Sequence, residues 1–365
     1  MDYFSRSSCR PTPAIFILCL TILNLVAFSR MTIRCMRNRQ NSPSRRINIF
    51  NKIVHSNSVE PMELTSTPKF PDPKSSSATL IERPSSYKAL KFNKDAIGAT
   101  YPGGHSMTIQ EKCPNGGEGI DLVIIITSSP SSVKTRTAIR QTWGSFGGRA
   151  DVRVLFILGE TKDTGLETLL QREEKLYGDI IRGKFYDSYL NLTLKTISTL
   201  EWFDRYCSGG KFLLKTDDDM FINVPRLISF IEKHKTDRNV IFGLKLTERK
   251  PIRDKNSKWY VSWEEYKPTV YPDYVIGAAY LLSNDIIHEL YETALHQSLL
   301  NMEDVFITGV VAGQLGIERV HADEFWNQAI EYTTCNIQQY ISIHAVSPVD
   351  QFNLWQKLFD DTSKC

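Results

Sequence analysis

Apolar runs alternate with amphipathic stretches from about residue 120 onward. Short, continuous, β-branched runs are typical of buried strands, whereas apolar positions spaced three or four residues apart are typical of helices. We expect strands at 121–127, 152–158, 180–186 and 212–216. We expect helices at 134–143, 166–177, 192–207 and 224–234. This alternation predicts an α/β fold, a mostly parallel sheet with helices on both faces.

The first 118 residues show no such alternation. Residues 11–29 contain no charged side chain, and this apolar stretch is close to the minimum length for a membrane span. A cleaved signal peptide is the alternative, although no convincing cleavage site follows. Residues 30–118 are rich in Ser, Pro, Asn and Lys and predict a disordered stem. Arginines on the C-terminal side of the span favour a cytosolic location for the rest of the chain.

Charge and cysteine content narrow the class of protein. The 365 residues carry a formal net charge of +3, and arginines before residue 60 supply much of it, which argues against nucleic-acid binding. None of the seven cysteines shows the C-x-x-C spacing of a zinc site. The four that follow the N-terminal region suit one or two disulfides, with three full pairings open: Cys113, Cys207, Cys335 and Cys365.

Three consecutive carboxylates, Asp217, Asp218 and Asp219, follow the predicted strand 212–216. Residues at i and i+2 of an extended chain share a side, so Asp217 and Asp219 can converge on one point. Such a pair suits a divalent cation that shares its shell with a phosphate. The alternative is a solvated turn that caps the next helix. The position at the carboxyl end of a strand in an α/β sheet favours a ligand site.

The second half of the chain contributes further candidates. Aromatic residues crowd 258–280 and are suited to stacking on sugar rings, although core packing is the better explanation for any single one. Gly277 marks a place where backbone can approach a ligand closely. Glu303 and Asp304 open an apolar helix, where acids also serve as simple N-terminal caps. His344 lies on a short predicted strand, where a lone histidine is usually structural.

These segments together resemble the β-1,3-galactosyltransferase and β-1,3-N-acetylglucosaminyltransferase family of Golgi type II membrane glycosyltransferases. Each motif alone is weak or moderate, but seven in the order of the family are specific, and they span about 119–358. The motifs are RTAIRQTWG (136–144), DSYLNLTLKT (187–196), KTDDDMFIN (215–223), KWYVS (258–262), YPDYVIG (271–277) with Tyr280, EDV (303–305) and SIH (342–344).

The resemblance implies a GT-A type α/β/α fold, a UDP-sugar donor, Mn²⁺ as cofactor and inversion at the anomeric carbon. It also implies a cytosolic tail (1–10), a signal-anchor (11–29), a stem (30–118) and a luminal catalytic domain (119–365) in the Golgi membrane, against the arginine count. Asn191, in the sequon Asn-Leu-Thr, then faces the compartment where N-glycosylation occurs.

The resemblance also implies roles for single residues. Asp219 and His344 are expected to bind the metal, and Asp217 to support the metal or the ribose. Asp304 is expected to be the catalytic base, with Glu303 as the fallback. The remaining expected UDP-sugar contacts are Arg136, Arg140, Asp218, Lys215 and Gly277. The expected acceptor and sugar pocket comprises Trp259, Tyr271, Tyr274 and Tyr280.

One departure from the family concerns the sugar pocket. The family often has a second glycine before the tyrosine, whereas this chain has Ala278-Ala279 before Tyr280, and the extra methyl is expected to narrow or reshape the pocket. We therefore expect a Mn²⁺-dependent, inverting transferase that moves galactose from UDP-galactose to the 3-hydroxyl of an acceptor glycan.

Other functions stay open at this point. One is transfer of N-acetylglucosamine from UDP-GlcNAc. Another is a catalytically silent Golgi lectin or chaperone, which the loss of an acid at 217, 219 or 304 would have supported, but all three acids are present. A nucleotide-binding protein facing the cytosol is the third, and glycosylation at Asn191 would exclude it.

Overall fold

The computed structural model describes residues 93–360, 362 and 365. The predicted cytosolic tail and signal-anchor lie outside the described residues, as does the stem up to residue 92. Across the described part of the chain, no helix combines the length and apolarity that crossing a bilayer requires.

One large sheet organises the described residues, and most of its strands run in the same direction. β4, β3, β2 and β5 are parallel neighbours, β8 runs antiparallel between β5 and β7, and β9 lies parallel to β7 at one edge. The mostly parallel α/β sheet is therefore confirmed. In the order of the sheet, the strands are β1 (His105–Met107), β4 (Ile180–Tyr186), β3 (Val152–Glu160), β2 (Leu122–Thr127), β5 (Phe212–Asp217), β8 (Tyr274–Ser283), β7 (Val240–Leu246) and β9 (Glu318–His321).

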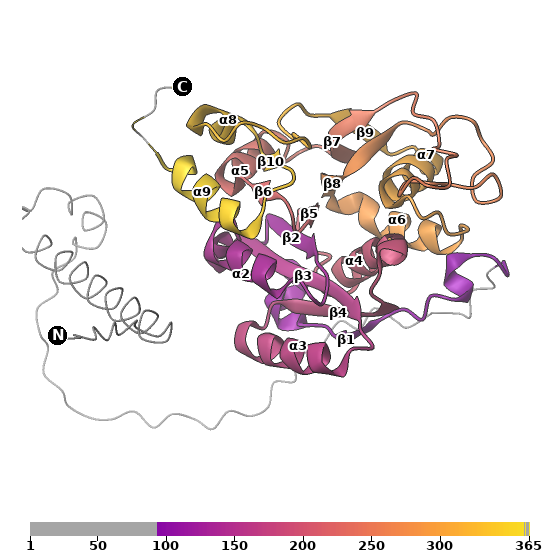
Figure 1. Cartoon of the computed structure of the whole chain (residues 1–365), viewed down its shortest axis with the longest axis horizontal. Helices are drawn as coiled ribbons and strands as arrows, with labels where there is room; N and C mark the ends of the chain where they lie inside the picture. The colour runs from indigo at the N-terminus through magenta and orange to yellow at the C-terminus, as the bar shows by residue number, and fades with distance from the viewer. Residues whose placement is uncertain (1–92, 361, 363–364) are drawn as a thin grey trace, which may run out of the picture. The chain divides into compact units, whose positions relative to one another are not determined.

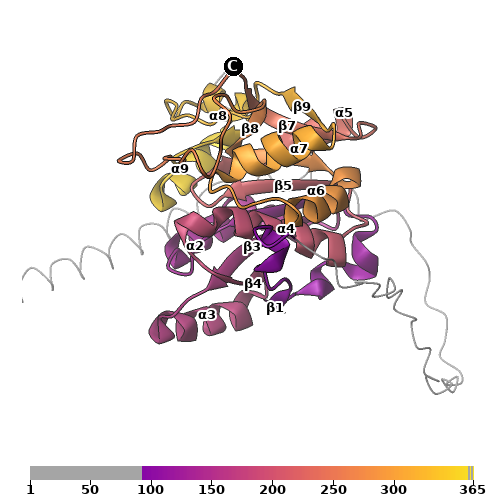
Figure 2. The same cartoon turned by 90° about the vertical axis from the view of Figure 1, so that its right-hand side faces the viewer.

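Helices cover both faces of this sheet (Figure 1). One face packs against α2 (Val133–Gln141), α3 (Thr164–Tyr177), α5 (Val224–Lys233), α8 (Thr334–Gln339) and α9 (Pro348–Leu358). The other packs against α4 (Leu192–Tyr206), α6 (Ile287–Leu295) and the π-helix η7 (Val305–Val311), and Figure 2 views α4 and α6 from their outer side. Alternate residues of β2 enter the two cores, Ile124 on the first face and Ile125 on the second, as strand geometry requires.

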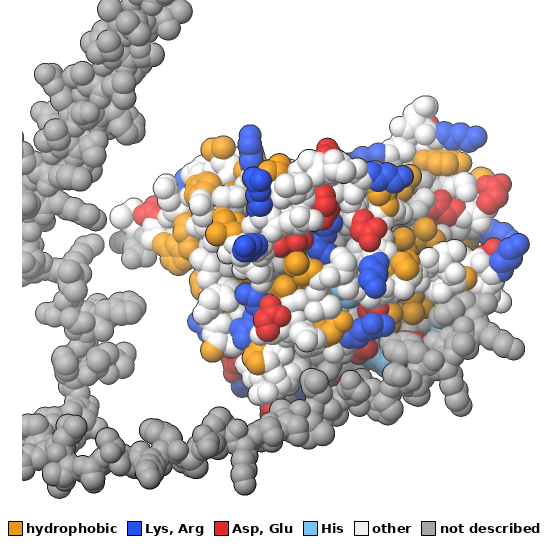
Figure 3. All heavy atoms as spheres, turned by 90° about the horizontal axis from the view of Figure 1, so that it is seen from below, with side chains coloured by type: hydrophobic (Ala, Val, Ile, Leu, Met, Phe, Trp, Pro, Cys, Tyr) orange, Lys and Arg blue, Asp and Glu red, His pale blue; other side chains and the backbone are white. Residues whose placement is uncertain are grey.

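Short elements complete the described structure. A separate two-stranded ladder pairs β6 (Phe221–Ile222) with β10 (Ser342–Ile343). The remaining helical segments are η1 (Ile97–Ala99), η2 (Gln110–Lys112), η3 (Pro114–Gly117), η4 (Trp143–Gly148), η5 (Tyr189–Asn191), η6 (Asn284–Ile286) and α7 (Ala312–Gln314). On the surface shown in Figure 3, basic, acidic and apolar side chains are interspersed.

The packed unit begins earlier than the expected boundary at residue 119. Ile97, Tyr101 and Ile109 are buried in the core that also contains α4 and α6. β1 adds a strand to the edge of the sheet by pairing with β4. The buried carboxylate of Glu201 on α4 accepts hydrogen bonds from the Tyr101 hydroxyl at 2.8 Å and from the backbone at 104. Residues expected in the stem therefore belong to the folded unit.

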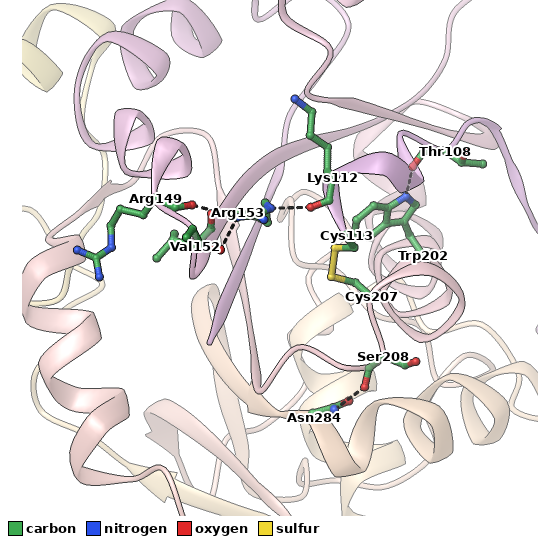
Figure 4. The surroundings of a disulfide bond; sticks show 11 residues. Thr108, Lys112, Cys113, Arg149, Val152, Arg153, Trp202, Cys207, Ser208 and Asn284 are labelled. Atoms are coloured by element: carbon green, nitrogen blue, oxygen red, sulfur yellow. Dashed lines mark hydrogen bonds between the residues drawn. A yellow bond between two sulfur atoms is a disulfide. The ribbon is translucent and has the colours of Figure 1, made fainter. Parts of the chain in front are cut away.

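Two disulfides resolve the pairing that the sequence left open, Cys113–Cys207 and Cys335–Cys365. The first joins the segment before β2 to the end of α4 (Figure 4). Two further bonds hold the same segment: Trp202 Nε1 donates to the carbonyl of Thr108, and Arg153 donates to the carbonyl of Lys112. This disulfide therefore fastens the edge of the fold to a core helix.

We predict that the Cys113→Ser/Cys207→Ser double variant loses more stability than Cys335→Ser/Cys365→Ser, its matched control. The two bonds span sequence separations of 94 and 30 residues. Loop-closure entropy gives upper estimates of about 5 and about 4 kcal/mol. Removal of the first pair also disturbs buried packing, because both of its cysteines lie in the core. Urea unfolding under non-reducing conditions measures the difference, and a larger loss in the control would contradict this account.

Candidate active site

Hydroxyl groups at the end of β2 hold two of the acids at the end of β5. The parallel register sets Thr127 beside Asp217. The Thr127 hydroxyl donates to Asp217 Oδ1 at 2.6 Å, and the Ser128 hydroxyl donates to Asp218 Oδ2 at 2.7 Å. Burial raises the pKa of Asp218 despite the hydrogen bond from Ser128. These contacts lie at the carboxyl ends of neighbouring parallel strands, where α/β sheets bind ligands.

The β6–β10 ladder brings His344 to Asp219 across more than a hundred residues of sequence. Ile343 pairs with Phe221, and the backbone N–H of Val346 donates to the carbonyl of Asp219 at 2.8 Å. His344 Nε2 consequently lies 3.3 Å from Asp219 Oδ2. The hydrogen bond with Asp219 raises the pKa of His344. Burial acts to raise the pKa of Asp219, but the contact with His344 outweighs it and lowers that pKa.

Asp219 and His344 form an exposed pair that fits a manganese-like ion. Their side chains are 51% and 37% exposed, so oxygen and nitrogen ligands are accessible from solvent. Residues 93–360, 362 and 365 contain no group of three or more His, Cys, Asp or Glu side chains placed to hold a metal. A cation here would complete its shell with diphosphate oxygens and water, as Mg²⁺ and Mn²⁺ commonly do. The third expected ligand, Asp217, uses Oδ1 to accept from Thr127 and Lys215.

Glu303 and Asp304 precede the π-helix η7, a rare conformation that often occurs at functional sites. Asp304 Oδ1 accepts from the N–H of Val305 at 2.8 Å, and Oδ2 accepts from the N–H of Gly277 at 3.1 Å. The Thr308 hydroxyl donates to the carbonyl of Asp304 and accepts from the N–H of Val275 on β8. Backbone and hydroxyl contacts therefore fix the two acids against β8.

The absence of a side chain at Gly277 allows Glu303 and Asp304 to lie close to β8. A Cβ at position 277 would lie 3.0 Å from Glu303 Oε2 and 3.2 Å from Asp304 Cβ, both tighter than ordinary contact. The sequence predicted that the missing side chain makes room for a ligand, whereas here it makes room for the two acids. Next to it, the Ala278 and Ala279 side chains pack in the core on the α2 and α5 face of the sheet. Their methyl groups are thus core atoms.

The two adjacent acids differ in accessibility and in charge environment. Glu303 is buried, and it accepts from the Tyr280 hydroxyl at 2.7 Å and from Lys215 at 3.4 Å. Asp304 is partly exposed to solvent. Burial, followed by repulsion from Glu303, raises the pKa of Asp304 to about 6. A carboxylate of that pKa is ionised at neutral pH and still basic enough to accept a proton.

The two arginines expected at the nucleotide make structural contacts instead. Arg136 is fully buried, and it bonds Glu173 on α3 through two nitrogens at 2.8 and 2.7 Å. It also donates to the carbonyl of Ser129, which shapes the loop after β2. Arg140 bonds Asp179 and Glu173. A direct nucleotide contact would require these bonds to break, so that role stays a prediction for both arginines.

The four expected pocket aromatics divide by exposure. Tyr271, Tyr274 and Tyr280 are at most 9% exposed, whereas Trp259 is 46% exposed. Trp259 lies beside Lys258, whose Nζ is 4.4 Å from the ring centroid, and the Lys258 charge acts on His344. Trp259 is therefore the exposed member of the four, whereas the three tyrosines are buried in the core that also contains α4 and α6. Sugar stacking on any of them stays a prediction.

Sequence reasoning missed an aromatic residue at this site, Tyr189 on η5. Its side chain is 58% exposed. Partial burial raises the pKa of Tyr189, and the charges of Asp304 and Asp217 act in the same direction. This segment is one of the family motifs and carries the sequon, but the sequence predicted no role for Tyr189 itself.

A buried lysine was missed as well. Lys195 on α4 donates to the carbonyl of Ser128 at 2.6 Å and to Asp187 Oδ1 at 3.0 Å. Asp187 in turn accepts from the N–H of Gly159 at 2.7 Å. Burial lowers the pKa of Lys195 in spite of Asp187. These hydrogen bonds connect the carboxyl ends of β2, β3 and β4. The sequence did not reveal this lysine, because a lysine in a helical pattern is usually solvent-exposed.

The candidate glycosylation site, Asn191, immediately precedes α4. Its side-chain amide donates to the carbonyl of Tyr186 at 2.8 Å. Thr193, the third residue of the sequon, is fully buried and donates to the carbonyl of Leu300 at 2.7 Å. Glycosylation at Asn191 stays a prediction.

Known proteins match this chain over the segments that carry the site residues described above. A family model described as Galactosyltransferase matches residues 134–323, which include both acid clusters and Gly277. Beta-1,3-galactosyltransferase 1 of Mus musculus is 35% identical over 240 residues, covering 65% of this chain and 73% of its own. Beta-1,3-galactosyltransferase 5 of Pan paniscus is 36% identical over 244 residues, covering 65% and 80%.

A third relative carries a different donor in its name. The human UDP-GalNAc:beta-1,3-N-acetylgalactosaminyltransferase 1 is 35% identical over 252 residues, covering 66% of this chain and 75% of its own. The family match spans more than half of the chain and includes the acids at the end of β5 and the acids before η7. The chain therefore belongs to the galactosyltransferase family and is a hexosyltransferase.

Proposed function

We propose that this chain transfers galactose from UDP-galactose to the 3-hydroxyl of an acceptor glycan and forms a β-1,3 linkage with inversion. The observation that carries the proposal is the state of Asp304. Two backbone N–H groups orient its carboxylate, burial raises its pKa to about 6, and it is less enclosed than its buried neighbour Glu303. This combination suits a general base and supports Asp304 over Glu303.

The reaction is a single displacement. The Asp304 carboxylate takes the proton from the acceptor 3-hydroxyl while that oxygen forms a bond to the anomeric carbon. The bond between the anomeric carbon and the phosphate oxygen breaks, and UDP leaves with the electron pair. Because the sugar is α-linked in the donor, one displacement gives the β product. Positioned proton transfer of this kind typically contributes about 10²–10⁴-fold to the rate.

The leaving diphosphate belongs on the side of Asp219 and His344. These two side chains would hold Mn²⁺, which when bound neutralises charge on the diphosphate. Asp217, fixed by Thr127 and Lys215, is suited to the ribose. In the proposed in-line displacement, Asp219 and His344 lie on the side of the leaving diphosphate, and Asp304 lies on the side of the acceptor.

The compartment and membrane topology belong to the same proposal. The chain acts as a single-pass type II protein of the Golgi membrane with its catalytic unit in the lumen. Support comes from the two disulfides, since such bonds persist in oxidising compartments.

UDP-GalNAc is the alternative donor, because the human relative that is 35% identical to this chain is named for that donor. A UDP-release screen of the full-length chain with Mn²⁺ tests the function. It pairs UDP-galactose, UDP-GalNAc and UDP-GlcNAc with a panel of acceptor sugars. Faster release with UDP-galactose and a β-1,3 product support the proposal. A preference for another donor would transfer the assignment to that sugar.

We predict that Asp304→Asn lowers kcat by about 10²-fold or more, because the amide cannot accept the proton. Affinity for UDP, measured by calorimetry, should change little, since Asp304 is assigned to the acceptor side. Glu303→Gln is the matched control and should cost less. If Glu303→Gln abolished turnover while Asp304→Asn retained most of it, the base would be Glu303.

We predict an acidic limb near pH 6 in the kcat/KM profile, which reports the groups of the free enzyme, from the pKa of Asp304. The pKa is raised, so Asp304 is protonated and inactive below about pH 6, and the rate increases as pH rises through that value. The residual rate of Asp304→Asn should lack this limb. An unchanged limb in that variant would assign the titration to another group.

We predict that Asp219→Ala and His344→Ala each weaken Mn²⁺-dependent UDP binding by tenfold or more, in keeping with the loss of a direct metal ligand. Calorimetry with and without Mn²⁺ measures the effect. The exposed pair His321–Asp323, whose side chains lie 2.9 Å apart, supplies the matched control variants. Equal losses in Asp323→Ala and Asp219→Ala would remove the metal assignment.

A further inference from the structure

Strand geometry places Lys215 between the two halves of the site. Lys215 and Asp217 are two positions apart on β5, at i and i+2, and share a face of the sheet. In the antiparallel ladder with β8, Lys215 lies directly opposite Tyr280. Its ammonium is 5.7 Å from the centroid of the Tyr280 ring. Lys215 therefore lies next to the donor-side acid Asp217 and to the tyrosine that bonds Glu303.

The ammonium group of Lys215 uses its whole hydrogen-bonding capacity within the protein. Nζ donates to Asp217 Oδ1 at 2.7 Å, to the carbonyl of Gly277 at 2.7 Å and to Glu303 Oε2 at 3.4 Å. An ammonium has three N–H donors, so these three acceptors account for all of them. The residue is 3% exposed. A diphosphate oxygen would have to displace one of these partners to reach it.

Lys215 is also the counter-charge of the buried acids. Burial acts to lower its pKa, but Asp217 and Glu303 outweigh burial and hold that pKa above its usual range. Without the ammonium, Glu303 would keep only the Tyr280 hydroxyl as a partner in a buried position. Removing one partner of a buried pair leaves an uncompensated charge, which is strongly destabilising. Glu303 adjoins Asp304, so a shift of Glu303 moves the base.

We propose that Lys215 is a positioning residue for the base and makes no contact with the donor. It fastens Glu303 and the carbonyl of Gly277 to β5, and thereby holds the Asp304 carboxylate against the N–H of Gly277. This role rests on the proposed function, in which Asp304 is the base. It replaces the direct UDP-sugar contact that the sequence predicted for Lys215.

The first test is Lys215→Met in the full-length chain. We expect kcat to fall by about 100-fold, the range of a displaced general base, while affinity for UDP with Mn²⁺ stays within about threefold. A direct phosphate ligand would instead lose affinity. A loss of UDP affinity as large as the loss of kcat would overturn the proposal.

The second test is compensation by Glu303→Gln in the Lys215→Met background. The double variant no longer buries an unpaired carboxylate, so we expect its kcat to exceed that of Lys215→Met by about tenfold, an expected coupling between contacting residues. Lys195→Met is the matched control, because Lys195 is also a buried lysine but pairs with Asp187. Glu303→Gln should not restore Lys195→Met. Rescue of both lysine variants, or of neither, would overturn the proposal.

Tyr280→Phe provides an independent test of the proposal if the Lys215→Met variant does not fold. It removes only the hydroxyl that donates to Glu303, and we expect kcat to fall about tenfold at unchanged UDP affinity. An unchanged kcat would contradict the positioning role. If the wild-type chain transferred no sugar from any UDP-hexose, the proposed function would fail separately. Lys215 would then be judged by UDP affinity and by recovery of thermal stability in the Lys215→Met/Glu303→Gln variant.

Discussion

Repulsion between carboxylates is the constraint on which the site depends. Asp217 at the end of β5 and Glu303 before η7 both contact one ammonium, that of Lys215, which lies inside the protein. Like charges held this close disfavour their ionised forms unless a cation lies between them. Burial, followed by repulsion from Glu303, raises the pKa of Asp304, and Asp219 is paired with His344. One counter-charge thus holds Asp217 and Glu303 together, and His344 supplies another for Asp219.

Backbone pairing determines where these charges meet. The ladder between β6 and β10 is two residues long on each strand, yet it carries His344 to Asp219 from the C-terminal part of the chain. The antiparallel strand β8 lies next to β5 and presents Gly277 to Glu303 and Asp304. The parallel part of the sheet supplies strand ends with hydroxyl groups, and the antiparallel strand β8 supplies the backbone N–H of Gly277 that bonds Asp304.

Local pattern was sufficient for the first half of the fold and for placing Asp217–Asp219 at the end of a strand. The roles expected of Glu303, Asp304 and His344 came from the family resemblance and stay predictions. The strand expected at 180–186 occurs as Ile180–Tyr186, and the helix expected at 224–234 occurs as Val224–Lys233, because buried runs and amphipathic spacing are local properties. Nonlocal contacts were beyond such reasoning. Ile97 and Tyr101 are single apolar residues in a polar stretch, and they are buried only because α4 and α6 offer a surface. Arg136 reads as a surface residue of α2 until Glu173 on α3 packs against it.

The central claim is that Asp219 and His344 hold the metal that binds the donor diphosphate, and that Asp304 acts as the base on the opposite side of the sugar. A crystal structure of the chain with Mn²⁺ and an unreactive UDP-galactose analogue tests this most directly. The account predicts an ion bound to Asp219 and His344, and the Asp304 carboxylate facing the anomeric carbon from the side opposite the diphosphate. An ion bound elsewhere, or Asp304 on the same side of the sugar as the diphosphate, would contradict it.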